Sequence, residues 1–122
     1  MTQHIILATG AIFGMLSVIF GAFGAHALKK ILSSEQLQSF EVGVKYQMYH
    51  AIVLLALGLN PEYTTSAIHV CFTLGIILFS FSIYGLILSE AKGKKMRFLG
   101  PITPIGGLLL VTGWLLLLLN VL

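Results

Sequence analysis

Polar side chains open the stretch YQMYHAIVLLALGLN, residues 46–60, whose second half is almost wholly apolar. On a helix, Tyr46, Gln47 and His50 cluster on one side. An imidazole beside a phenol and a carboxamide can relay a proton or hold a polar ligand. His26, near the end of an earlier apolar stretch, adds a second imidazole. These four residues are the candidate binding residues, and no residue stands out as catalytic.

A metal or haem held by His26 and His50 is the sharpest alternative. No carboxylate or thiolate lies near them at ligand spacing, which favours no metal and no cofactor. The sequence also has no visible nucleophile and base with an orienting group, so we predict that the chain is not an enzyme. We expect His50 to be an interhelical histidine that bonds to Tyr46, Gln47 or a hydroxyl of Ser80 or Ser82. A proton or ligand role is the alternative.

The composition decides what positions these residues. The chain has 122 residues, of which 57% are hydrophobic and 9% charged, and its mean hydropathy is +0.99. Soluble domains carry about 25% charged residues, so the apolar excess must face lipid. The net charge of +3 comes from few residues and indicates no nucleic-acid partner. The single cysteine excludes an internal disulfide.

Four membrane-spanning helices are predicted in one domain, residues 1–122. The first, third and fourth apolar stretches each reach the length of about 20 residues that a spanning helix needs. The second apolar stretch reaches this length only if its helix starts near Ser34, where Ser33 and Gln36 fit a capping box. This helix is expected to end at Leu59, because Pro61 pushes the residue before it, Asn60, out of the helical conformation. The fold class is therefore an all-α membrane protein, a tight bundle whose second helix is extended at its cytoplasmic end. The expected spans are 4–28, 34–59, 67–89 and 102–122.

The basic residues predict the orientation. All seven lie in or next to two of the connections, so the positive-inside rule puts both loops in the cytoplasm and both termini outside. Glu41 and Lys45 are expected at the cytoplasmic surface as a weak ion pair, with His50 deeper in the hydrocarbon. The basic residues are Lys29, Lys30, Lys45, Lys92, Lys94, Lys95 and Arg97.

Small residues recur on one face of three spans and predict close helix packing. A surplus small-residue face would suit a homo-oligomer. Tyr63, Tyr84, His4 and His69 are expected near the membrane interfaces, with Trp114 deeper. The residues expected at helix contacts are Gly10, Gly14, Gly21, Gly24, Gly75, Gly106, Gly107 and Gly113.

Four stretches resemble the signatures of the family called domain of unknown function 423: GAFGAHALKK, FEVGVKYQMYH, LFSFSIYGLIL and LGPITPIGGLLLVTGWLLL. The resemblance covers nearly the whole chain, although the third loop is longer and more basic than expected. It implies a small four-helix, multi-pass protein of the bacterial inner (plasma) membrane, related to a small eukaryotic transmembrane protein. It implies no reaction. The positions that the family pattern emphasises are, in this sequence, Gly21, Gly24, His26, Tyr46, His50, Pro104, Gly106, Gly107 and Trp114.

We therefore expect an integral membrane protein of unassigned biochemical function, acting as a non-catalytic structural or partner-binding component. Its partners would be the lipid bilayer and either further copies of itself or another membrane protein. The alternative is a small oligomeric transporter or proton-coupled carrier that uses the polar patch around His50. Small multidrug transporters depend on a carboxylate inside the first span, and here that span has no charged residue.

Overall fold

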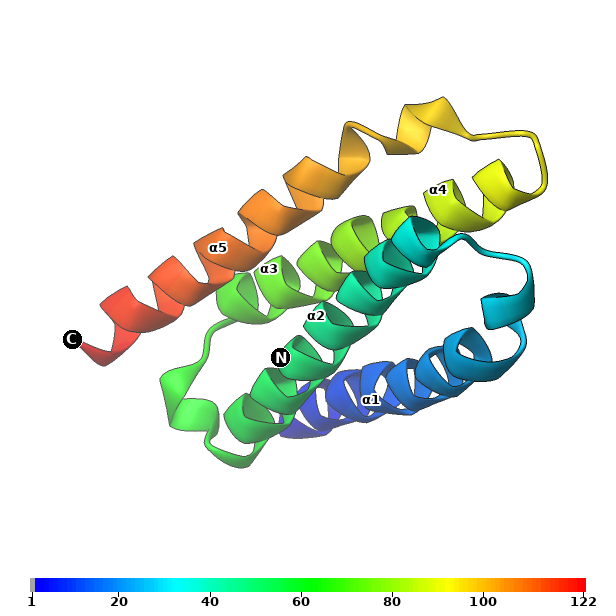
Figure 1. Cartoon of the computed structure of the whole chain (residues 1–122). Helices are drawn as coiled ribbons and strands as arrows, with labels where there is room; N and C mark the ends of the chain where they lie inside the picture. Colours follow the sequence, from blue (N-terminus) through cyan, green and yellow to red (C-terminus); the bar gives the residue numbers. More distant parts are fainter. Residues whose placement is uncertain (1) are drawn as a thin grey trace.

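The computed structural model describes residues 2–122, which form a bundle of helices (Figure 1). Within this range, four helical segments are long and apolar enough to cross a membrane, and there is no strand. The expected all-α membrane fold is confirmed. The helices are α1 (Gln3–His26), α2 (Ser34–Leu59), α3 (Ser66–Ile76), α4 (Ser82–Ala91) and α5 (Ile102–Val121), joined by turns η1 (Leu28–Lys30), η2 (Pro61–Tyr63) and η4 (Arg97–Leu99), with a π-helical segment η3 (Ile77–Phe81).

The ends of α2 follow from local chemistry. Ser33 Oγ accepts from the Gln36 amide at 3.1 Å, and Gln36 Oε1 accepts from the Ser33 amide at 2.9 Å, so the predicted capping box is present. The helix ends at Leu59, and Asn60 leaves the helical conformation just before Pro61.

The third span differs from a regular helix. It runs from Ser66 to Ala91, but residues Ile77–Phe81 form a π-helical segment between α3 and α4. The sequence there contains no proline or glycine, so it carries no local signal for a distortion. The segment lies at a close contact across the bundle, where Gly106 of α5 packs directly on the backbone of Leu78 and Phe79. Ser82 Oγ also donates to the Phe79 carbonyl at 2.9 Å.

The glycine face of α1 packs along α2. Gly14 faces Ala51, so His50 lies level with the middle of α1. At Gly10 an added Cβ would lie 3.0 Å from the Ala51 carbonyl oxygen, which shows how closely the two backbones approach. The facing pairs are Gly10 with Leu55, Gly14 with Ala51, Gly21 with Val44, and Gly24 with Phe40.

The other small residues expected at helix contacts lie between α3–α4 and α5. Gly75 meets Leu110, Gly113 meets the Phe72 ring, and Gly107 lies at ordinary contact distance from the Phe79 ring. These contacts leave α1 and α5 on opposite sides of the bundle, with α2 and α3–α4 between them (Figure 1).

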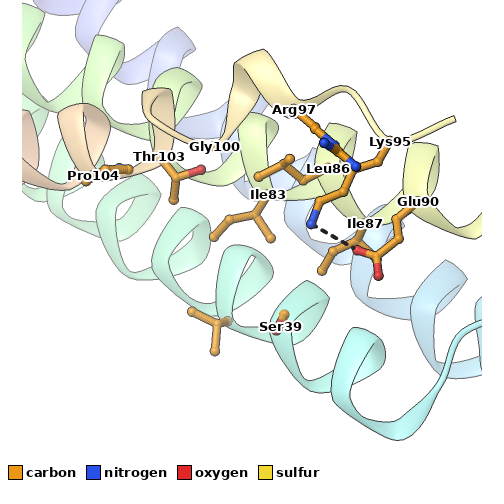
Figure 2. Close-up of a pocket in the computed structure, with 11 residues that line it drawn as sticks. Ser39, Ile83, Leu86, Ile87, Glu90, Lys95, Arg97, Gly100, Thr103 and Pro104 are labelled. Atoms are coloured by element: carbon orange, nitrogen blue, oxygen red, sulfur yellow. Dashed lines mark ion pairs between the residues drawn. The ribbon is translucent and has the colours of Figure 1, made fainter.

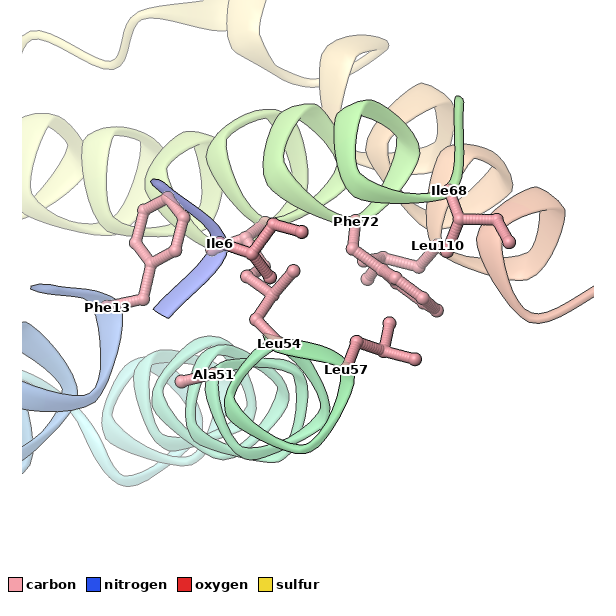
Figure 3. Close-up of a cluster of buried hydrophobic side chains, with 9 residues drawn as sticks. Ile6, Phe13, Ala51, Leu54, Leu57, Ile68, Phe72 and Leu110 are labelled. Atoms are coloured by element: carbon pink, nitrogen blue, oxygen red, sulfur yellow. The ribbon is translucent and has the colours of Figure 1, made fainter. Parts of the chain in front are cut away.

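Two apolar clusters fill the bundle. The first joins all four spans near the end that holds η2, as Figure 3 shows for Ile6, Phe13, Leu54, Phe72 and Leu110. The second lies toward η1 and consists of Leu28, Leu32, Phe40, Tyr84 and Ile87. Tyr84 is 7% exposed and His69 is 5% exposed, so both side chains face the interior of the bundle, and Tyr84 is not the lipid-facing anchor that was expected. The Tyr84 hydroxyl donates to Gln47 of α2. His69 Nε2 lies 3.3 Å from Thr9 Oγ1 of α1, whereas its buried Nδ1 has no partner within the described residues.

Candidate functional site

Gln47 is the centre of a buried polar network on α2. Its Nε2 donates to the Phe13 carbonyl of α1 at 2.9 Å, and its Oε1 accepts from the Tyr84 hydroxyl of α4 at 2.7 Å. Its side chain is fully buried. One carboxamide thus ties three helices together, with its oxygen and one amide hydrogen both used.

A second pair of bonds extends this network. Ser80 Oγ donates to the Gly43 carbonyl at 2.7 Å, and Ser82 Oγ lies 2.6 Å from Thr103 Oγ1 of α5. The two serines lie on either side of Phe81, the last residue of the π-helical segment, and Ser80 bonds to α2 while Ser82 bonds to α5. Neither serine bonds to His50, and of the alternative partners expected for it the structure shows Tyr46.

His50 is 4% exposed and both of its ring nitrogens have partners. Nδ1 lies 2.7 Å from the Tyr46 carbonyl, and Nε2 accepts from Trp114 Nε1–H at 3.0 Å. Because a carbonyl only accepts, Nδ1 carries the proton and Nε2 is the acceptor. The neutral tautomer therefore satisfies every polar atom of the ring. Tyr46 contributes its backbone oxygen, while its ring stacks on the imidazole at 6.3 Å between centroids.

Trp114 is the partner that sequence reasoning missed. It lies 64 positions from His50 on a different helix, and only its place in the fourth family-like stretch marked it. Its ring is 47% exposed, so one edge bonds His50 and the rest covers the imidazole on the outer side. Tyr46 and Phe72 complete the surroundings of the imidazole.

His26 lies apart from this network. It is exposed in the last turn of α1, in a groove shared with Lys29 and Lys30. Because His50 is level with the middle of α1, the helical rise separates the two histidines by about 16 Å along the bundle. Residues 2–122 contain no group of three or more side chains able to hold a metal ion. The structure therefore brings Tyr46, Gln47 and His50 together and leaves His26 outside.

A polar stripe on α2 faces away from the core. We call Glu41, Lys45, Tyr46 and Tyr49 the outer stripe; Tyr49 is 54% and Tyr46 42% exposed. Residues 2–122 hold no ion pair between Glu41 and Lys45, so that expectation is wrong. Lys45 lies about 8 Å along the helix from His50. This separation agrees with the predicted order, in which His50 lies a little over one helical turn beyond Lys45.

The comparisons with known proteins agree with this architecture. A family model described as "Protein of unknown function (DUF423)" matches residues 20–107. The UPF0382 membrane protein SH2409 of Staphylococcus haemolyticus is 40% identical over 97% of this chain and 95% of its own. The UPF0382 membrane protein C1782.12c of Schizosaccharomyces pombe is 41% identical, covering 85% and 90%.

The UPF0382 inner membrane protein YgdD of Escherichia coli K12 is 34% identical over 97% of this chain and 89% of its own. No solved structure matches the chain. The relatives' names assign a membrane location and no activity. The chain therefore belongs to the DUF423 family of proteins of unknown function and is a multi-pass membrane protein, as the resemblance implied.

Proposed function

We propose that this chain is a non-catalytic structural component of the membrane that works as a homo-oligomer, with two copies joined through the outer stripe of α2. The network around Gln47 and His50 supports a structural role, because its hydrogen bonds are made within the bundle. A catalytic or carrier site needs a group left free to exchange a proton or ligand. Here the proton on His50 Nδ1 and the lone pair on Nε2 are both engaged.

The observation that carries the proposal is the depth of the outer stripe. Tyr49 lies next to His50, hence level with the middle of the bundle, and half of its side chain is exposed. Within residues 2–122, the hydroxyls of Tyr46 and Tyr49 make no hydrogen bond. A polar group left unbonded in hydrocarbon costs several kcal/mol, and tyrosines facing lipid belong at the interfaces. A partner helix on this face would remove the cost.

The stripe is complementary to itself. A hydroxyl both donates and accepts, so two copies of Tyr49 meeting at a two-fold axis satisfy each other. Glu41 and Lys45 lie one helical turn apart, so in two parallel copies the acid of one lies about 6 Å in level from the base of the other, a distance that the long lysine side chain can span. The unpaired ammonium of Lys45 would gain a carboxylate at a depth where the alternative is to extend toward the headgroups.

Cysteine cross-linking in the native membrane tests this. Tyr49→Cys in a Cys71→Ser background should give a covalent dimer on mild oxidation. Val111→Cys in the same background is the control, because Val111 is 63% exposed on another helix, α5, within one turn of Trp114, which bonds His50. Equal dimer yields at both positions, or none at Tyr49, would contradict the proposal. A cross-link to a different protein at Tyr49 alone would identify a heteromeric partner instead.

The carrier alternative has its own test. Solute or proton flux in proteoliposomes that disappears in His50→Ala but persists in Tyr49→Ala would favour transport through the bundle. The dimer alone predicts no flux in either variant.

A further inference from the structure

We propose that the groove between α2, α4 and the loop before α5 binds one anionic phospholipid, with its phosphate on Arg97 and an acyl chain on the apolar wall below. This inference does not rest on the proposed oligomer. The groove has a volume of about 730 Å³. That size matches cavities that hold small organic ligands, about 300–1,000 Å³. Figure 2 shows its lining residues.

The groove is divided chemically from one end to the other. Arg97 and Lys95 lie at its loop end, while Ile83 and Leu86 form its wall along α4 (Figure 2). Val42 of α2 also lines it. Such a division matches an amphiphile whose head is anionic and whose tail is a hydrocarbon chain. A soluble anion would use the cations and leave the apolar wall unused.

Arg97 is the free cation of the groove. Lys95 pairs with Glu90 at 3.7 Å. The Arg97 guanidinium makes no ion pair and no side-chain hydrogen bond within residues 2–122. A guanidinium offers five donors in a planar fork that suits the two oxygens of a phosphate. Arg97 is therefore available to an external anion, whereas the charge of Lys95 is balanced by Glu90, which also lines the groove.

The level of the groove suits a phospholipid headgroup. Ser39 and Val42 belong to the first third of α2, and the helical rise puts them about 12–17 Å from the level of His50. The hydrocarbon boundary of a bilayer lies about 15 Å from its middle. The positive-inside rule assigns this end of the bundle to the cytoplasmic leaflet, where basic pockets between membrane helices bind anionic headgroups.

Native mass spectrometry of the purified full-length protein in mild detergent tests the inference. Phosphatidylglycerol should bind as a single adduct, and phosphatidylcholine should bind weakly. Arg97→Ala should weaken phosphatidylglycerol binding by about tenfold or more, as expected for loss of hydrogen bonds to a charged group. Arg97→Lys should retain part of the affinity, because it keeps the charge and loses the fork.

Lys94→Ala is the matched control. It removes the same charge from the same exposed loop, but Lys94 does not line the groove. Its affinity for phosphatidylglycerol should stay close to that of the unmodified protein. Equal losses in Lys94→Ala and Arg97→Ala, or equal binding of both lipids, would overturn the site. Displacement of the lipid by millimolar inorganic phosphate would show a free-anion site and overturn the lipid assignment.

Discussion

Replacing Gly106 by alanine tests the closest helix contact in the bundle. An added Cβ would lie 2.6 Å from the Leu78 carbonyl carbon and 2.7 Å from Phe79 Cα, and closer still to the Phe79 amide nitrogen. These are backbone atoms, so no side-chain rotation relieves the overlap. Ordinary contact begins at 3.4 Å, so the contact with the Leu78 carbonyl carbon alone requires a withdrawal of 0.8 Å, and the closer Phe79 amide nitrogen requires more. A gap of 0.5–1 Å forfeits about a quarter to a half of a contact's dispersion energy.

The energetic result follows from this withdrawal. Overpacking of this kind costs about 1–3 kcal/mol. The 2.6 Å contact between Ser82 Oγ and Thr103 Oγ1 spans the same junction and would lengthen too. Gly107→Ala is the control, because its Cβ would meet the Phe79 ring at 3.6 Å, an ordinary contact. That variant should be unchanged or up to about 1 kcal/mol more stable, since alanine restricts the unfolded chain.

The assay is unfolding in mixed micelles, with SDS added to a mild detergent and helix content followed by circular dichroism. Gly106→Ala should unfold at a lower SDS fraction than the unmodified protein, while Gly107→Ala should not. Coincident transitions for the two alanine variants would refute the idea that α5 rests directly on the π-helical backbone.

Two further predictions concern the polar network. Trp114→Phe leaves the acceptor on His50 without its donor and should lower the unfolding free energy by about 0.6–2 kcal/mol, the range for hydrogen bonds between membrane helices. The same SDS titration measures this loss. If the bond is its cause, Trp114→Phe in a His50→Leu background should lower the unfolding free energy little further. Gln47→Leu removes the acceptor of the buried Tyr84 hydroxyl and the second donor to the Phe13 carbonyl, which keeps its bond within α1, and should cost about 1–3 kcal/mol. Adding Tyr84→Phe should then recover part of that loss, and a double variant no more stable than Gln47→Leu would contradict the assigned bond.

The spans, their helical character and the ends of α2 could be predicted from sequence because each depends on local properties. Apolar length and the need to satisfy backbone groups in lipid make each span a helix. The cap at Ser33 and the stop before Pro61 depend on residues within one turn. The family-like stretches likewise carry the family resemblance in the sequence itself.

Only part of the candidate site could be predicted from the sequence, and the reason is physical. The helical periodicity of α2 groups Gln47 and His50, but their partners Phe13, Tyr84 and Trp114 lie on three other helices. Periodicity gives the face of a helix and not the helix that it meets. Which residues meet across two helices depends on the register between them, and no pattern within one helix gives that register.

The sequence by itself therefore determined a membrane-embedded helical protein of one family, together with the faces that each helix presents. Only the tertiary structure decided that the imidazole bonds to Trp114, that the third span opens into a π-helical segment and that Arg97 lies over an apolar groove. The first group of properties arises from interactions along one helix and with lipid. The second arises where separate helices meet, since close packing lets Gly106 of one span reach the backbone of another.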